Sequence, residues 1–236
     1  MRPIIILPTY NEKENILAIT KEIFSIGIRD LKIIIVDDNS PDGTGQIADQ
    51  LANSNENISV IHREKKEGLG PAYVAGFKKA LEDPSNEYIF EMDADFSHQP
   101  KYLPDFLDKA KKYDVVLGSR NIPGGGVENW NWFRRFISWL ANTMVRAILM
   151  TPIKDLTGGY KCWNRKVLEN LDLDNIQSSG YNFQIELSYK AEKKGFSIVE
   201  TPIIFVERRA GNSKFNSGII LESFINVIKL RFSKVK

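Results

Sequence analysis

The sequence predicts an α/β fold in which an open, mostly parallel (mixed) sheet is flanked by helices. Five short apolar runs in the first half of the chain, most of them rich in Ile and Val, are typical of buried parallel strands: 4–7, 31–36, 58–61, 88–92 and 115–117. Helical patterns separate these runs, at 12–24, 44–52, 71–81 and 102–112. Strands that alternate with helices form β-α-β units, which place helices on both faces of the sheet.

The second half of the chain is less regular. The glycines at 124–126 indicate a flexible loop. Four elements are expected after it: a helix at 132–150, a helix at 181–194, a strand at 197–205 and an amphipathic helix at 219–235. Because 236 residues suit one large domain and no linker or repeat interrupts the chain, we expect a single domain over residues 1–236.

The composition is that of an ordinary globular protein, with 42% hydrophobic and 26% charged residues. The single cysteine, Cys162, excludes an internal disulfide and a Cys-based zinc site, and it fits a reducing compartment. The segment that follows Met1 does not have the pattern of a signal peptide. No uncharged apolar run reaches the roughly 18 residues of a membrane span. The sequence therefore predicts a soluble or peripheral protein.

Basic residues gather at the C-terminal end. Residues 201–236 contain seven Lys and Arg but only two Glu, whereas the whole chain has a net charge of +2. This excess favours an anionic partner, such as a phosphate, a membrane surface or nucleic acid. The sequence has no helix-turn-helix, zinc-finger or ribonucleoprotein signature, so no nucleic-acid partner is expected.

Asp93 and Asp95 come directly after the predicted strand at 88–92. Two carboxylates spaced i, i+2 at a strand end repel each other, and a cation relieves that repulsion. Mg²⁺ and Mn²⁺ bind carboxylate oxygens and usually share them with the phosphates of a substrate. The pair therefore predicts a metal-assisted enzyme that acts on a nucleotide or another phosphate.

Polar clusters also follow the other predicted strands. They are Pro8-Thr9-Tyr10-Asn11-Glu12, the acidic segment 37–44, Asp93-Ala94-Asp95 and Gly118-Ser119-Arg120. In open parallel sheets the ligand lies at the carboxyl ends of the strands, which is where these clusters meet. Their convergence predicts a nucleotide and metal site. A structural alternative is that Asp37 and Asp38 cap the helix that follows them.

The ordered set of motifs resembles the family 2 glycosyltransferases with the GT-A fold, and more narrowly the dolichol-phosphate (polyprenyl-phosphate) mannosyltransferases. The matching segments are 8–12 (PTYNE), 36–44 (VDDNSPDGT), 68–70 (GLG), 92–98 (MDADFSH), 118–120 (GSR), 155–158 (DLTG) and 180–184 (GYNFQ). The resemblance covers nearly the whole chain. It implies a Rossmann-like nucleotide-sugar-binding half at 1–120 and an acceptor-binding half at 121–236 that ends in the amphipathic helix.

The resemblance also implies the residues of the site. The nucleotide sugar would be bound by Pro8, Tyr10, Glu12, Val36, Asp38, Asp93, Ala94, Asp95, Arg120, Arg208 and Lys214. The metal, Mg²⁺ or Mn²⁺, would be bound by Asp93, Asp95 and Ser97, where Ser97 stands at a position that is glutamine in some members of the family. The acceptor phosphate would be bound by Arg134 and Ser138. Asp93, Asp95 and Arg120 would be the catalytic residues.

The implied reaction transfers mannose from GDP-mannose to dolichyl or polyprenyl phosphate, with inversion and release of GDP. The metal, together with Arg and Lys side chains, would neutralise the leaving diphosphate, which Arg208 and Lys214 would clamp. The ionised acceptor phosphate would need no strong base. The implied location is the cytoplasmic face of a membrane, without a span in this chain. The segments 132–150 and 219–236 could lie in the membrane interface, or a separate small membrane subunit could recruit the protein.

Several alternatives stay open at this point. The donor could be UDP-glucose or another nucleotide sugar. A nucleotidyltransferase would normally have a glycine-rich, lysine-containing loop after the first strand, and the segment 8–12 lacks one. A non-catalytic scaffold would be expected to have lost Asp93 or Asp95. Trp130, Trp132 and Trp139 could face lipid or lie in the core.

Overall fold

Seven strands form the main sheet of the structure, a computed structural model that describes residues 2–176, 178, 180–207 and 217–233. Their order is β3-β2-β1-β4-β7-β5-β8. The strands are β1 (Arg2–Thr9), β2 (Lys32–Asp37), β3 (Ile58–His62), β4 (Asn86–Glu91), β5 (Val115–Ser119), β7 (Lys161–Asn164) and β8 (Ile198–Pro202). Every pairing is parallel except the two that β7 makes, with β4 and with β5. The predicted α/β fold with a mixed, mostly parallel sheet is confirmed.

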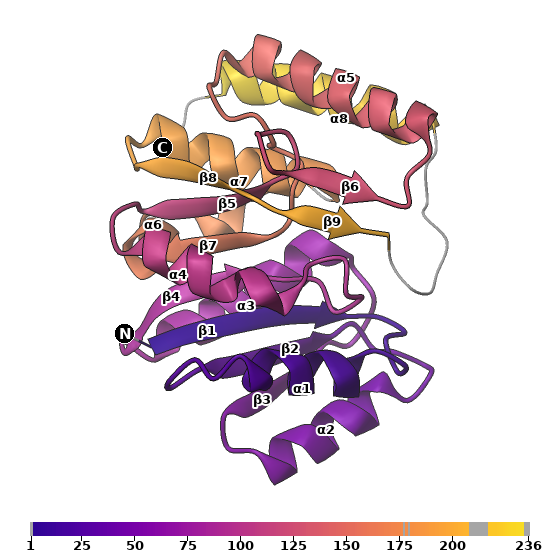
Figure 1. Cartoon of the computed structure of the whole chain (residues 1–236), viewed down its shortest axis with the longest axis vertical. Coiled ribbons are helices and arrows are strands. Elements are labelled where there is room, and N and C mark those ends of the chain that lie inside the picture. The colour runs from indigo at the N-terminus through magenta and orange to yellow at the C-terminus, as the bar shows by residue number, and fades with distance from the viewer. Residues whose placement is uncertain (1, 177, 179, 208–216, 234–236) are drawn as a thin grey trace.

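The helices follow the strands as the alternating pattern predicts (Figure 1). They are α1 (Ile16–Ser25), α2 (Thr44–Ser54), α3 (Leu69–Glu82), α4 (Leu103–Ala110), α5 (Trp132–Leu149), α6 (Arg165–Asn170), α7 (Tyr181–Lys193) and α8 (Ser217–Phe232), with short 3-10 turns at Pro100–Tyr102 and Leu173–Asn175. The first helix begins four residues later than predicted. Residues 13–15 form a turn instead, in which the backbone N–H groups of Asn15 and Ile16 both donate to the carbonyl of Glu12 (2.9 Å each).

Alternate residues of β1 enter two separate apolar cores, one on each face of the sheet. Ile4 and Ile6 pack in the core that contains side chains of α3 and α7, whereas Ile5 and Leu7 pack with α1 and α4. Gly76 lets α3 approach this strand closely, because a Cβ at this position would lie 2.3 Å from Cγ2 of Ile6. The sheet is thus buried on both faces, as the uninterrupted apolar runs predicted.

Three parts of the strand prediction are wrong. One of them is the short strand β6 (Gly126–Glu128), which was not predicted and begins within the glycine segment that was expected to be a loop. The four-residue strand β7 was not predicted, because Lys161 and Asn164 at its ends conceal the apolar pattern. The strand expected at 197–205 is divided, so that β8 joins the main sheet and β9 (Ile204–Val206) pairs with β6 (Gly126–Glu128) in a separate two-stranded sheet. The division brings residues 205–207 towards the carboxyl edge of the main sheet, where the backbone N–H of Val206 donates to the carbonyl of Ser97 (3.4 Å).

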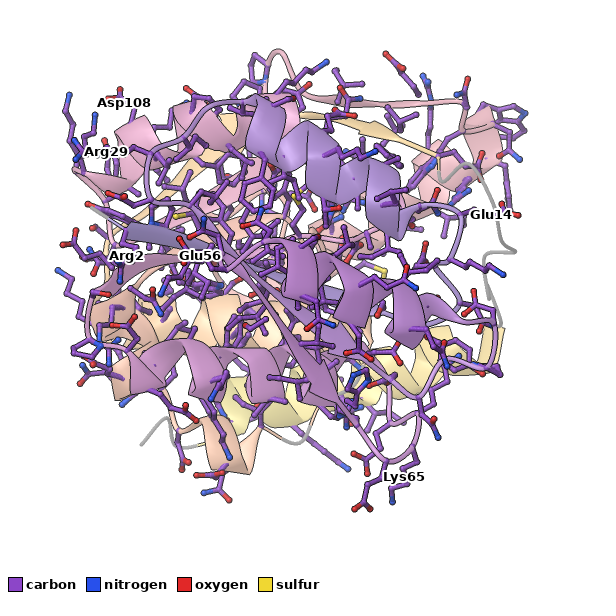
Figure 2. All side chains as sticks on the ribbon, turned by 90° about the horizontal axis from the view of Figure 1, so that it is seen from below. Arg2, Glu14, Arg29, Glu56, Lys65 and Asp108 are labelled. Atoms are coloured by element: carbon purple, nitrogen blue, oxygen red, sulfur yellow. The ribbon has the colours of Figure 1, made fainter. Side chains whose placement is uncertain are left out.

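Helices α5 and α8 pack against each other at one end of the molecule, and α8 also contacts α7 (Figure 1). Within the described ranges, no helix is both long enough and apolar enough to span a membrane. Charged side chains such as Glu14, Arg29 and Lys65 point outward at the rim of the α/β body (Figure 2). The outward face of α5 differs, because its large exposed side chains are mostly apolar: Trp132, Phe133, Phe136, Trp139, Leu140 and Met144.

Candidate active site

Asp93 follows the carboxyl end of β4 and is held by contacts from two sides. Its Oδ1 accepts a hydrogen bond from the hydroxyl of Tyr73 (3.1 Å), and its backbone N–H donates to Nδ1 of His98 (3.0 Å). Burial, together with the nearby carboxylates, raises the pKa of Tyr73 well above its ordinary value, so this hydroxyl remains a donor. The Asp93 side chain is still 28% exposed. A ligand can therefore reach a carboxylate whose orientation is already fixed.

Asp95 lies deeper than Asp93, with 5% of the residue exposed, and Ala94 between them is buried. Its Oδ1 accepts from the backbone N–H of Ser97 (3.0 Å), in a tight loop in which Phe96 is left-handed (φ 65°). The hydroxyl oxygen of Ser97 is buried and has no hydrogen-bond partner among the described residues. A buried oxygen without a partner is unfavourable unless a ligand completes its contacts.

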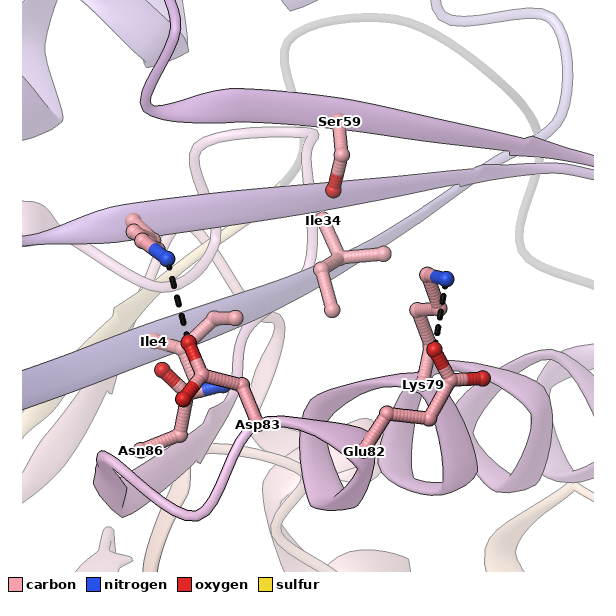
Figure 3. A pocket seen from close by; sticks show the side chains of 8 residues that line it. Ile4, Ile34, Ser59, Lys79, Glu82, Asp83 and Asn86 are labelled. Atoms are coloured by element: carbon pink, nitrogen blue, oxygen red, sulfur yellow. Dashed lines mark hydrogen bonds and ion pairs between the residues drawn. The ribbon is translucent and has the colours of Figure 1, made fainter.

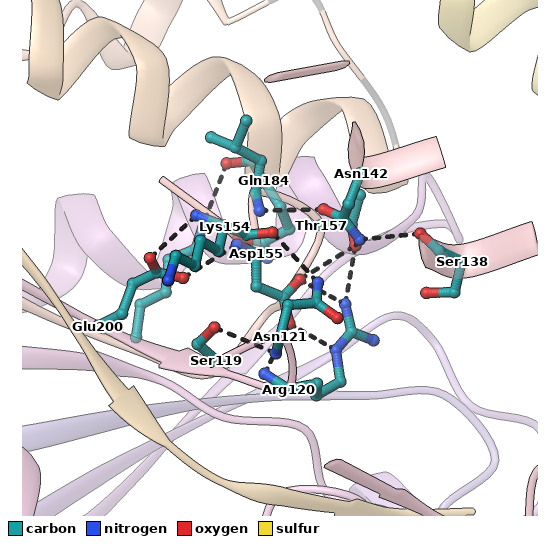
Figure 4. Close-up of polar contacts among 12 residues, drawn as sticks. Ser119, Arg120, Asn121, Ser138, Asn142, Lys154, Asp155, Thr157, Gln184 and Glu200 are labelled. Carbon is teal, nitrogen blue, oxygen red and sulfur yellow. Dashed lines mark hydrogen bonds and ion pairs between the residues drawn. The ribbon is translucent and has the colours of Figure 1, made fainter. Parts of the chain in front are cut away.

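Arg120 follows β5, and one carboxylate holds both its guanidinium and its backbone N–H. Its Nε and Nη2 donate to the two oxygens of Asp155 (2.7 and 2.6 Å), its backbone N–H donates to Oδ2 (2.9 Å), and Nη2 also contacts Oγ1 of Thr157 (2.8 Å; Figure 4). Burial raises the pKa of Asp155, but Arg120 and the hydrogen bonds outweigh burial and bring it below the ordinary value. The guanidinium is therefore fixed in one orientation.

The same cluster attaches α5 to the site. The amide of Asn142 donates to Oγ1 of Thr157 (3.1 Å) and accepts from the backbone N–H of Leu156 (3.2 Å). Arg134 and Ser138 precede Asn142 by eight and four residues, so all three lie on one face of the helix. Figure 4 shows Ser138 and Asn142 near Arg120, and Arg134 shares their face of α5, so both residues that were predicted to bind the acceptor phosphate lie on that face.

Trp130 lies near both arginines. The guanidinium carbon of Arg134 lies 4.1 Å from the centroid of the Trp130 ring, and that of Arg120 lies 5.9 Å from it. The Arg134 guanidinium is also paired with Glu207, which follows β9. Trp130 thus belongs to the site, whereas Trp132 and Trp139 are 77% and 56% exposed. The sequence alone did not distinguish these tryptophans.

Asp38 holds the loop that follows β3. Its Oδ1 accepts from Arg63 (2.5 Å), and its Oδ2 accepts from the backbone N–H groups of Glu67 (3.3 Å) and Gly68 (3.1 Å). Its neighbour Asp37 accepts from Ser40 Oγ (2.6 Å), inside the turn that leads to α2. Both carboxylates therefore organise loops at the carboxyl edge, and the predicted contact of Asp38 with the nucleoside remains a prediction.

Four more of the predicted nucleotide residues lie at the same edge. Pro8 and Val36 are register partners in β1 and β2, but the Val36 side chain is fully buried in the core, so only its backbone faces the edge. Tyr10 is half-buried beneath the ammonium of Lys66, which lies 3.4 Å from the ring centroid. Glu12 accepts from the amide of Asn15 (2.8 Å) at the start of α1. Arg208 and Lys214 lie outside the described residues.

Two buried residues of opposite charge, Glu91 and Lys161, lie next to each other below the carboxylates. Glu91 of β4 and Lys161 of β7 are register partners with no exposed surface. Trp163 Nε1 donates to Glu91 (2.7 Å), and Lys161 Nζ donates to the carbonyl of Gln184 (2.9 Å). Burial raises the pKa of Glu91 and lowers that of Lys161 to about 8. Sequence reasoning missed this pair, since an antiparallel strand between two parallel ones gives no signal that it will bury a lysine.

His98 is buried in an aromatic environment behind Asp93. Its ring stacks on Tyr160 with 4.9 Å between the centroids, and Phe205 of β9 lies at 5.7 Å with its edge towards it. Burial lowers the pKa of His98. Because Nδ1 accepts from the backbone of Asp93, the neutral ring has its proton on Nε2. His98 therefore supports the turn that presents the two carboxylates.

A pocket at the amino ends of the strands, on the opposite edge of the sheet, is not part of this site (Figure 3). Its charged side chains pair with one another, as Lys32 does with Asp83 (3.3 Å) and Lys79 with Glu82 (2.6 Å). It contains no polar groups that converge on a ligand. The carboxyl edge is therefore the candidate active site, as the sequence predicted.

Comparisons with known proteins place this α/β fold, with its carboxylate pair, in a known family. Residues 4–172 match the family described as Glycosyl transferase family 2. The chain belongs to this family, so the predicted family is confirmed.

Two relatives are similar over nearly the whole chain. The undecaprenyl-phosphate mannosyltransferase of Micrococcus luteus is 42% identical over 229 residues, which is 97% of this chain and 93% of that protein. The polyprenol monophosphomannose synthase of Mycolicibacterium smegmatis is 44% identical over 228 residues, which is 96% of this chain and 85% of that protein.

Solved structures with lower identity show the same fold. Glucosyl-3-phosphoglycerate synthase from Mycobacterium tuberculosis, in complex with Mn²⁺, uridine diphosphate and phosphoglyceric acid, has a TM-score of 0.72 and 16% identity, and the likeness covers 98% of this chain and 79% of that one. A mannosyltransferase from Pyrobaculum calidifontis, in complex with GDP-Man and Mn²⁺, has a TM-score of 0.62 and 21% identity, over 90% of this chain and 59% of that one.

Proposed function

We infer that the protein transfers mannose from a nucleotide sugar to a polyprenyl phosphate and so forms polyprenyl-phosphate mannose. The observation that carries this inference is the 42% and 44% identity, over nearly the whole chain, to two proteins whose names specify that product or reaction. The site supports it, because Asp93 and Asp95 meet two arginines at one edge of the sheet. We propose GDP-mannose as the donor, and UDP-glucose is the alternative donor to be tested beside it.

The candidate site suits a hard divalent cation. Asp93 is oriented and accessible, Asp95 is buried next to it, and the buried Ser97 hydroxyl lacks a partner among the described residues. These are oxygen donors, which Mg²⁺ and Mn²⁺ prefer. The described residues contain no group of three or more His, Cys, Asp or Glu that could hold a metal, so the diphosphate of the donor would supply further ligands. When bound, the cation would neutralise charge on the departing nucleoside diphosphate.

The chain's own residues position the two substrates. Arg120 is fixed by Asp155 and would stabilise negative charge on the donor without reorganising during the reaction. Arg134 and Ser138 would bind the acceptor phosphate across Trp130. A phosphate monoester is largely ionised at pH 7, so its oxygen can attack the anomeric carbon without a general base. Residues 1–120 would thus bind the donor, and residues 121–236 would bind the acceptor.

A lipid acceptor also explains the apolar surface of α5. Trp132, Phe136 and Trp139 are 77%, 49% and 56% exposed, and Phe232 of α8 is 83% exposed. An amphipathic surface of this kind binds in the interface of a bilayer, where Arg135 could meet lipid headgroups. We propose that α5 and α8 place the protein on the membrane that contains its acceptor, as a peripheral protein on the cytoplasmic face. A small membrane subunit that covers the same helices is the competing arrangement.

The test measures transfer of labelled mannose from GDP-mannose to a short polyprenyl phosphate in detergent. Assays would contain Mg²⁺, Mn²⁺ or a chelator, and parallel assays would supply UDP-glucose. We expect lipid-linked mannose that depends on the metal and on GDP-mannose. Transfer from UDP-glucose alone would contradict the proposed donor, and full activity with chelator would contradict the metal site.

A matched pair of variants localises the chemistry. Asp95→Asn removes one carboxylate of the pair and should lower the turnover at least 100-fold, because the buried position admits no substitute ligand. Asp108→Asn removes an exposed carboxylate from α4 that pairs with Lys111 (3.0 Å), and it should leave turnover unchanged. Equal activity of the two variants would contradict the assigned role of Asp95.

A further inference from the structure

Arg134 and Arg120 have different kinds of carboxylate partner, although both lie against Trp130. The side chains of Arg120 and Asp155 are 8% and 0% exposed, and backbone and hydroxyl groups reinforce that pair. The side chains of Arg134 and Glu207 are 27% and 39% exposed, and their carboxylate–guanidinium contact is the one ion pair of Arg134 among the described residues. One arginine is thus permanently paired, whereas the other can exchange its partner.

An exposed carboxylate is a weak ligand for a guanidinium compared with a phosphate monoester. The pair gains little in water, because solvent screens it and both side chains lose rotamer freedom. A phosphate monoester brings a charge between −1 and −2 and oxygens that match the planar fork of arginine. Glu207 Oε1 pairs with Nη1 of Arg134, and Trp130 covers one face of the guanidinium plane, so a phosphate that binds at Nη1 must displace Glu207 from it.

We propose that Glu207 occupies the acceptor-phosphate subsite before the acceptor binds and is displaced from Arg134 by the incoming phosphate. This inference rests on the proposed role of Arg134 in binding the acceptor. Glu207 would then be a specificity-determining residue, because an acceptor must compete with a carboxylate to enter. A phosphate monoester can do so, whereas a neutral alcohol or a single carboxylate cannot.

The proposal predicts a gain of affinity when the competitor is removed. In Glu207→Gln, the dissociation constant of a short prenyl phosphate, measured by calorimetry, should fall roughly two- to fivefold, as expected for loss of an exposed pair. The KM for the polyprenyl phosphate acceptor should fall by the same factor, while the KM for GDP-mannose stays unchanged. Glu207→Ala gives a second variant with the same expectation, and thermal unfolding checks that both are folded.

Glu128→Gln is the matched control. Glu128 is exposed on β6 and is the register partner of Val206, next to Glu207 in the chain, so its removal changes the local charge equally. If both Gln variants tighten binding to the same extent, net charge explains the effect and the proposal is wrong. An unchanged or weaker affinity in Glu207→Gln would also overturn it, because Glu207 would then orient Arg134 instead of competing for it.

A double-mutant cycle identifies the residue through which Glu207 acts. In an Arg134→Gln background, the Glu207→Gln substitution should change the dissociation constant less than about 1.5-fold. A full effect in that background would overturn the proposal. The calorimetric comparison needs no turnover, so it decides this inference even if the chain transfers no mannose, and the failure of the proposed function is then distinguishable.

Discussion

Asp155→Asn should strongly destabilise the fold, because Asp155 is the fully buried partner of Arg120. Its carboxylate accepts from Nε, Nη2 and the backbone N–H of Arg120, and from the hydroxyl of Thr157. An asparagine of the same shape would direct its amide protons at these donors and leave the guanidinium without a counter-charge. Removing one partner of a buried ion pair costs about 3–5 kcal/mol. That is a large part of the roughly 5–15 kcal/mol that stabilises a typical domain.

The measurement is the free energy of unfolding from urea denaturation at pH 7. Asp174→Asn is the control, because Asp174 pairs with Lys78 on the surface with a side chain that is 78% exposed, and its loss should cost less than about 1 kcal/mol. A loss below about 1 kcal/mol for Asp155→Asn would refute the reasoning. It would mean that water reaches the Arg120 pair and that Arg120 is not held in one orientation.

The pH dependence of the same variant gives an independent check with a defined sign. The pKa of Asp155 in the folded protein lies below its ordinary value of 3.8. The stability that Asp155 contributes is therefore complete above pH 3.8 and is lost as the pH falls through the lower, folded pKa. The difference in unfolding free energy between wild type and Asp155→Asn should be constant near neutral pH and shrink in acid. A difference that grows in acid would contradict this assignment.

Three further predictions concern other layers of the site. Tyr73→Phe removes the hydroxyl that orients Asp93, so the Mn²⁺ concentration for half-maximal transfer should rise about 10- to 100-fold, and an unchanged metal titration would contradict this role. Lys161→Met leaves the buried Glu91 carboxyl without the ammonium of its register partner and should cost about 3–5 kcal/mol in urea denaturation, whereas a cost near zero would indicate that both side chains are uncharged in the folded protein. Phe136→Ser should weaken binding to lipid vesicles about tenfold in a sedimentation assay, as expected for the loss of one apolar side chain, and should not change transfer to a short soluble acceptor. The control is Leu17→Ser, at an exposed apolar position on α1, which should leave vesicle binding unchanged.

Much of the carboxyl edge of the sheet could be predicted from the sequence, because it depends on local patterns. Asp93 and Asp95 end an apolar strand, and the parallel topology brings Pro8 and Asp38 to the same edge. The acceptor-phosphate role of Arg134 and Ser138 was proposed only through the family resemblance and stays a prediction. The motif at 155–158 matched the family, but its sequence gave no indication that Asp155 would accept two hydrogen bonds from the guanidinium of Arg120. The role of Asp38 in holding Arg63 and the loop at 67–68 was likewise not foreseen.

The sequence by itself determined the alternation of strands and helices, the carboxylate pair and the family. These features depend on residues that are close in the chain, where apolar periodicity and strand ends act directly on the backbone. Only the tertiary structure decided that β7 runs antiparallel between β4 and β5, and that Arg120 pairs with Asp155 and Arg134 with Glu207. Charged partners that lie 35 and 73 residues apart leave no local pattern, because their meeting depends on how the whole sheet and its helices pack.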